Sequence, residues 1–143
     1  LPKTRKIWLI LAGSTLTMML DVIIDPVAKL GKQWFLGEIY YYAHPGEYFG
    51  IPITNFLGWF LVPLVVILFN IFIWKHIDTQ RTAPNGQHSL LNPLFYSSIA
   101  LFNIGVAFYI GAILLGVASS VILVMIMTIV TQTRKRIIRR ALP

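Results

Sequence analysis

Three long apolar stretches divide the chain. They cover about residues 7–30, 53–74 and 90–130. As a helix the third stretch would be about 60 Å long, twice the roughly 30 Å hydrocarbon core of a bilayer. We therefore expect a tight turn near Gly111 and four membrane-spanning helices, at about 7–30, 53–74, 91–110 and 113–132. A single long, tilted helix is the alternative interpretation of the third stretch.

The composition agrees with this pattern. Hydrophobic residues make up 57% of the 143 residues and charged residues 12%, whereas soluble domains average about 45–50% apolar and about 25% charged. The predicted fold class is therefore all-α, a polytopic transmembrane helix bundle that forms one membrane domain over residues 1–143. Because the chain has no cysteine, a disulfide framework, a thiol nucleophile and a cysteine-ligated metal are excluded.

Basic residues flank the apolar stretches. With four spans, ten of the 12 Lys and Arg residues fall on one side of the membrane, and Lys29 and Lys32 fall on the other. The positive-inside rule makes the ten-residue side cytoplasmic, together with a loop at 75–89. The net charge of +7 thus reflects membrane topology and does not indicate nucleic-acid binding. The low acidic content favours a bacterial cytoplasmic membrane over a salt-saturated archaeal cytoplasm.

Two carboxyl groups interrupt the first predicted span. Asp21 and Asp25 lie four residues apart in its outer half and share one helix face. Pro26 has no N–H, so the carbonyl of Val22 loses its helical partner. Such groups are tolerated at membrane depth only where they face protein or a wet cavity. Ionisable residues inside a span are therefore candidates for a functional site.

The segment after the first span is rich in aromatic residues. Residues 31–52 read GKQWFLGEIYYYAHPGEYFGIP, which predicts an interfacial or re-entrant segment and not a hydrophilic loop. In the next span, Asn55 and Trp59 share a face, and Gly58 permits a close neighbour. We expect these groups and the two carboxyls to converge at one depth, towards the outer side.

The pattern LDVIIDP, followed by GKQW and then EYFGIPITNFLGWF, resembles the membrane carotenoid 1,2-hydratases, which include the bisanhydrobacterioruberin hydratases. Members share an aspartate-rich helix ending in Asp-Pro and a later G.P..N..GW segment. The matching positions are Asp21, Asp25, Pro26, Gly31, Trp34, Tyr48, Gly50, Pro52, Asn55, Gly58 and Trp59. Because family members are usually longer on the N-terminal side, we expect this chain, which begins with Leu1, to be the C-terminal part of a longer protein.

The resemblance implies a reaction, the addition of water to the terminal 1,2 double bond of an acyclic carotenoid end group. The product is a tertiary alcohol. The implied partners are an acyclic carotenoid, water and membrane lipid, and other enzymes of the carotenoid pathway are candidate partners. The resemblance implies neither a redox cofactor nor a metal.

The candidate catalytic residues are Asp21, Asp25 and Asn55. Hydration of an isolated alkene requires a proton donor to C2 and a water held for attack on the cation at C1. A carboxyl group in a poorly solvated site keeps its proton to higher pH and can act as a general acid. We expect one aspartate to donate the proton and the other to accept a proton from the water, and the sequence leaves open which does which. Asn55 is the candidate that positions the water.

The candidate substrate-binding residues are Trp34, Tyr48 and Trp59, together with Gly50 and Gly58. Aromatic faces stabilise a cation by about 0.5–2 kcal/mol each. The alternative is that Trp34 and the tyrosines at 40–42 are interfacial anchors and that Trp59 only packs.

Structural roles are also open for several polar residues. Asp25 is alternatively expected to pair with Lys29, also four residues away, while Asp21 bonds a neighbouring helix. Asn70 and Asn103 are predicted to make interhelical hydrogen bonds. No two histidines have metal-ligand spacing, so a metal site is not expected.

Two other functions remain open. A carotenoid cyclase also begins by protonating an end-group alkene, and differs in that ring closure quenches the cation. A proton-coupled carrier, or a non-catalytic membrane subunit, would use the aspartates as a relay, although a carrier more often shows repeated halves with broken helices.

Overall fold

The computed structural model describes residues 3–76 and 91–141. Within these ranges the regular elements are all helices, with no β-strand, and residues 34–52 are irregular. The helices are α1 (Lys3–Lys29), α2 (Ile53–His76), α3 (Leu91–Tyr109) and α4 (Ile113–Ala141), and a short 3-10 turn, η1, covers Gly31–Gln33. All four α-helices are long and apolar enough to cross a membrane. The predicted all-α transmembrane bundle is therefore confirmed. The loop predicted at 75–89 falls almost entirely outside the described residues.

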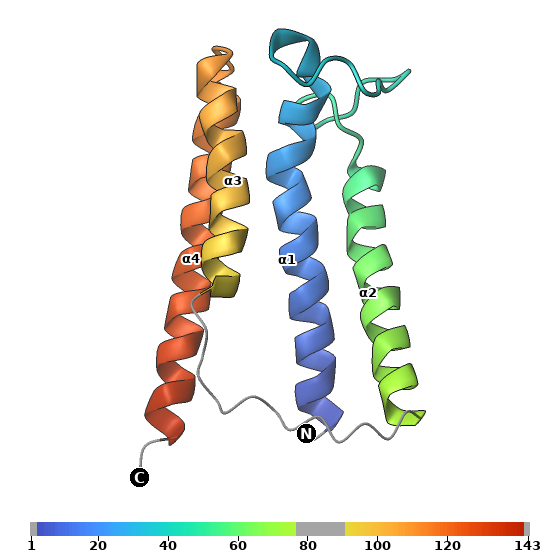
Figure 1. The fold of residues 1–143 in the computed structure, drawn as a ribbon, viewed down its shortest axis with the longest axis vertical. Helices are drawn as coiled ribbons and strands as arrows, with labels where there is room; N and C mark the ends of the chain where they lie inside the picture. Colours follow the sequence, from blue (N-terminus) through green and yellow to red (C-terminus); the bar gives the residue numbers. More distant parts are fainter. Residues whose placement is uncertain (1–2, 77–90, 142–143) are drawn as a thin grey trace.

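Consecutive helices run in opposite directions (Figure 1). The start of α1 lies near the ends of α2 and α4, and residues 31–52 lie at the other end of the bundle, as does the turn between α3 and α4. That turn occupies residues 110–112, where the N–H of Ala112 donates to the carbonyl of Ala107 at 2.9 Å. The predicted division near Gly111 is therefore confirmed, and the single long helix is wrong.

Helix α1 lies at the centre of the bundle and contacts the other three α-helices. Its side facing α3 and α4 supplies Ile23 and Val27, both fully buried. Two apolar clusters form around them, one with Ala100, Ile104 and Leu123 and the other with Ala107 and Leu115. The alanines of α3 allow its backbone to approach α1 closely, which is the usual way in which membrane helices pack.

The other side of α1 packs against α2. Since α2 has no substantial contact with α3 or α4 among the described residues, most of its apolar side chains are exposed. In a bilayer such side chains meet lipid tails without penalty, because lipid is as apolar as they are. The α1–α2 interface is therefore the place where polar side chains of α2 have to find partners.

Two predictions about polar positions are corrected by the structure. Asn70 and Asn103 each donate to a carbonyl four residues earlier in their own helix, at 2.8 Å and 3.0 Å, so the predicted interhelical bonds are wrong. A side-chain amide at membrane depth satisfies itself locally when the backbone of its own helix lies within reach. Helix α1, in turn, continues through Pro26 to Lys29.

Candidate functional site

Asp21 and Asp25 lie side by side on the face of α1 that is turned towards α2. Each is only 8% exposed. The side-chain amide of Asn55, in the first turn of α2, donates to Asp21 Oδ2 at 3.0 Å and to Asp25 Oδ2 at 2.9 Å. Its one nitrogen thus bridges both carboxyl groups. The three residues predicted as catalytic from the sequence are brought together in one hydrogen-bonded cluster.

Two tyrosines from the segment 31–52 complete this cluster. The hydroxyl of Tyr40 donates to Asp25 Oδ1, and it also lies 3.1 Å from the Asp25 backbone carbonyl. The hydroxyl of Tyr42 donates to Asp25 Oδ2 at 3.0 Å. The two rings meet edge to face, with centroids 5.7 Å apart. Asp25 therefore accepts from the segment above it as well as from α2.

Tyr40 and Tyr42 are not among the catalytic or substrate-binding residues predicted from the sequence, although their segment was expected to lie near the carboxyl pair. Their spacing carries a signal, because residues two apart in an extended chain point to the same side. Tyr41, between them, is 77% exposed. A run of three tyrosines has the composition of an interfacial anchor, and that composition hides the alternation.

Both tyrosines remain protonated donors at neutral pH. Burial, the hydrogen bond to Asp25 and the negative charge of Asp25 raise the pKa of Tyr42 to about 12. The same causes, with burial again the largest, raise the pKa of Tyr40. A phenol held next to a carboxylate resists losing its proton, because a second negative charge would be created beside the first.

The lysines at the end of α1 and in segment 31–52 bond groups other than the two aspartates. Lys29 donates its ammonium to the backbone carbonyl of Gly50 at 3.1 Å. The alternative in which Lys29 partners Asp25 is therefore not the arrangement observed. Lys32 forms an ion pair with Glu38. The cationic groups nearest to the site are thus engaged along the segment itself.

Trp34 has a structural position. Its indole N–H donates to the carbonyl of Val27 at 3.2 Å, near the C-terminal end of α1. Its ring packs edge-on against Phe35 and also contacts Phe102 of α3, with centroids 4.8 Å and 6.3 Å away. These contacts seat the start of the segment on α1 and α3. A contact between Trp34 and substrate stays a prediction.

The other predicted substrate-binding residues lie around the end of α2. The ring of Tyr48 packs edge-on against Phe56, next to Asn55, and its buried hydroxyl has no hydrogen-bond partner among the described residues. Trp59 is 46% exposed, and Gly58 has open space beside it. Gly50 lies under the ammonium of Lys29. Their substrate-binding roles also stay predictions.

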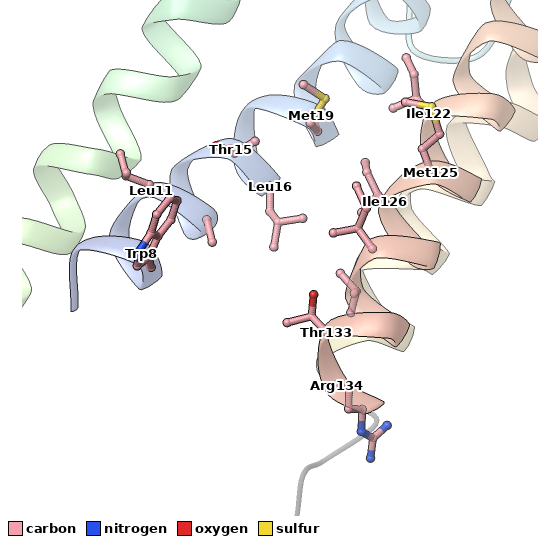
Figure 2. A pocket seen from close by; sticks show the side chains of 13 residues that line it. Trp8, Leu11, Thr15, Leu16, Met19, Ile122, Met125, Ile126, Thr133 and Arg134 are labelled. Atoms are coloured by element: carbon pink, nitrogen blue, oxygen red, sulfur yellow. The ribbon is translucent and has the colours of Figure 1, made fainter. Parts of the chain in front are cut away.

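An apolar groove lies elsewhere, between α1 and α4, with a volume of about 720 Å³ (Figure 2). Its α1 wall includes Leu16 and Met19, its α4 wall includes Ile126, and Thr133 and Arg134 line the part near the C-terminal end of α4. Met19 and Asp21, two positions apart, point to opposite sides of a helix. The groove and the carboxyl pair are therefore separate features.

The cluster combines groups that can exchange protons. Among the described residues, no group of three or more His, Cys, Asp or Glu side chains is placed to hold a metal ion. Two carboxyl groups, one amide and two phenols provide several hydrogen-bond donors and acceptors in one place. Groups of this kind suit acid–base chemistry on an apolar molecule in the membrane.

Comparisons with known proteins identify the family. A family model described as "Carotenoid biosynthesis protein" matches residues 2–130, which include the whole hydrogen-bonded cluster. No curated protein and no solved structure gives a significant match. The chain is thus an integral membrane protein that belongs to the carotenoid biosynthesis protein family.

Proposed function

We propose that this protein adds water to the terminal 1,2 double bond of an acyclic carotenoid end group. The observation that carries the proposal is the pair of buried carboxyls, Asp21 and Asp25, bridged by Asn55 inside a membrane-spanning bundle. Membership of the carotenoid biosynthesis family supports a carotenoid-related, lipid-soluble substrate. Hydration of an alkene requires an acid that reaches the alkene carbon C2 and a base that reaches the attacking water. The two carboxyl groups are the candidates for these roles.

The proposed reaction is balanced without an oxidant or reductant. One carboxyl group transfers its proton to C2 of the alkene, and a tertiary cation forms at C1. Water attacks C1. The second carboxyl group, which starts as the carboxylate, accepts a proton from that water and becomes protonated. The product has gained an H at C2 and an OH at C1. Transfer of the proton from the second aspartate back to the first restores the starting state.

The surroundings of the pair suit a cation that must last until water attacks it. The carboxyl group of Asp25 is hydrogen-bonded to two aromatic residues of segment 31–52, Tyr40 and Tyr42. The half-buried ring of Tyr48 packs against Phe56, the residue that follows Asn55 in α2. Aromatic faces and a nearby carboxylate both stabilise positive charge in a poorly solvated site. By the positive-inside rule, this end of the bundle is the outer one.

The test is to express the full-length protein in cells that accumulate an acyclic carotenoid. The extracted pigment is compared in mass and retention with an empty-vector control. Hydration adds one water, and we expect the gain to disappear in Asp21→Asn and Asp25→Asn. Glu38→Gln is the matched control, because it removes a carboxyl group that pairs with Lys32 instead. Full hydration by both aspartate variants would contradict the proposal.

Two other outcomes redirect the proposal. A pigment of unchanged mass with a cyclised end group would make the same residues those of a cyclase. Unaltered pigment, with the protein confirmed in the membrane, would favour the carrier or non-catalytic subunit, for which proton-gradient-dependent uptake is the next measurement.

A further inference from the structure

The two carboxyl groups of the pair receive unequal numbers of hydrogen bonds. Asp25 accepts three in its carboxyl group, from the hydroxyls of Tyr40 and Tyr42 and from the amide of Asn55. Asp21 accepts one, from the same amide. Both Oδ2 atoms bond one nitrogen, so the two groups are close neighbours. The asymmetry comes from the segment 31–52, which reaches only the second aspartate.

This asymmetry selects a protonation state. A carboxylate only accepts hydrogen bonds, whereas a protonated carboxyl group has an O–H of its own to place. Three donors directed at one group therefore favour its charged form. Once Asp25 is charged, a second charge beside it in a poorly solvated site is disfavoured, so the pair keeps one proton, and that proton resides on Asp21.

We propose that Tyr40 and Tyr42 are positioning residues that hold Asp25 as the carboxylate and thereby make Asp21 the proton donor. The assignment of roles in catalysis rests on the hydration proposed above. Asp21 gives its proton to C2 of the alkene, and Asp25 accepts the proton of the water that attacks C1. The tyrosines touch neither carbon and act through Asp25.

The other charged groups around the pair leave this assignment unchanged. On α1, Lys29 donates to the carbonyl of Gly50, and beyond it Lys32 pairs with Glu38. The residue of α2 that faces the pair is the neutral Asn55. Helix α3 contains no charged residue, and the charged residues of α4 lie in its C-terminal part, from Arg134 onward. The titratable side chains that donate hydrogen bonds to the pair are Tyr40 and Tyr42.

The test measures protonated carboxyl groups directly, by infrared spectroscopy of the purified full-length protein in lipid nanodiscs across pH. At neutral pH we expect the band of one protonated carboxyl group. Asp21→Asn removes this band, whereas Asp25→Asn retains it under mildly acidic conditions. The opposite result, with the band lost only in Asp25→Asn, overturns the assignment. Both substitutions are close to isosteric, so the variants should keep the fold. This measurement also leaves both tyrosines in place.

The tyrosine variants test the positioning role. Tyr40→Phe and Tyr42→Phe each remove one hydrogen-bond donor to the Asp25 carboxylate. At a given acidic pH, the infrared band of a second protonated carboxyl group should therefore be stronger in these variants than in the wild type. Tyr41→Phe is the matched control, because Tyr41 lies between them and is exposed. The same increase in Tyr41→Phe, or no increase in either of the other two, refutes the role.

The activity profile links this assignment to catalysis. In the tyrosine variants the acidic limb of the pH–activity profile should move towards neutral pH, because the carboxylate base has lost one of its hydrogen-bond donors. A purely structural defect lowers activity at all pH values without moving the profile. The infrared result needs no substrate, so the expected bands together with unaltered pigment would refute the hydration and keep the protonation assignment.

Discussion

Replacing Gly50 with alanine tests how the aromatic segment is fastened over the carboxyl pair. Gly50 has a φ of +81°, in the left-handed region that disfavours side chains. A Cβ at this position would overlap the ammonium of Lys29, which donates to the carbonyl of Gly50 itself. Alanine therefore adds backbone strain and also breaks the hydrogen bond that ties the segment to α1.

The size of the effect follows from these two contributions. A non-glycine residue in the left-handed region costs about 1–2 kcal/mol, and loss of a hydrogen bond from a charged donor costs about 1.5–3 kcal/mol. Gly50→Ala should therefore lower the free energy of unfolding by about 2.5–5 kcal/mol. Gly37→Ala is the control, because Gly37 has a φ of +73° with no atom within 4 Å of the added Cβ. Gly37→Ala should lower the free energy of unfolding only by the backbone strain, about 1–2 kcal/mol.

The assay is a titration with SDS in mixed micelles, monitored by circular dichroism, on a double-mutant cycle with Lys29→Ala. In the Lys29→Ala background, Gly50→Ala should cost only about 1–2 kcal/mol, because the overlapping ammonium is gone. The coupling energy is then about 1.5–3 kcal/mol. Equal destabilisation by Gly50→Ala and Gly37→Ala, or strict additivity in the cycle, would refute the reasoning.

Three further predictions concern the two aspartates, the packing of α3 against α4, and the contribution of Tyr42 to stability at high pH. Asp21→Asn and Asp25→Asn should each lower the rate of hydration by about 10²–10⁴-fold, the usual contribution of a general acid or base, measured by chromatography of the pigment with the amount of membrane-inserted protein held equal. Gly116→Ala should destabilise the α3–α4 pair by about 1–3 kcal/mol in the SDS titration, because its Cβ would lie 2.8 Å from a ring of α3; Gly105→Ala, which has open space, should not. The hydroxyl of Tyr42 has a folded-state pKa of about 12 against an ordinary value of 10.0, so its contribution to stability is full below about pH 10 and is lost as the pH rises through about 12. The stability difference between the wild type and Tyr42→Phe should vanish over that interval, and a difference that persists above it would contradict the stated cause.

The spans were predictable because the membrane imposes a local rule. Every backbone polar group in hydrocarbon needs an internal partner, so an apolar run of sufficient length becomes a helix whatever its neighbours are. The thickness of the bilayer predicted the break near Gly111, since a helix over residues 90–130 is too long for one crossing. The interhelical bonds predicted for Asn70 and Asn103 were wrong, because a side-chain amide also has carbonyls of its own helix within reach.

The packing faces were not predictable in the same way. In water, burial separates core residues from surface residues, but in lipid an apolar side chain is satisfied on either side of its helix. Ile23 of the core and Val65 of α2, exposed at 61%, are indistinguishable by hydrophobicity. The pattern of apolar residues therefore predicted that α1 spans the membrane. It did not predict which helix packs against the side of α1 that carries Asp21 and Asp25.

The sequence by itself determined that Asp21 and Asp25 share a helix face, because a spacing of four residues is a property of any α-helix. It also determined that Asn55 lies near the same depth, since both groups flank one connecting segment. Only the tertiary structure decided that this segment folds back so that Tyr40 and Tyr42 donate to Asp25 and not to Asp21. Those contacts depend on the path of an irregular chain anchored by Trp34 and Lys29. An irregular path has no fixed period, so its contacts are set by three-dimensional packing.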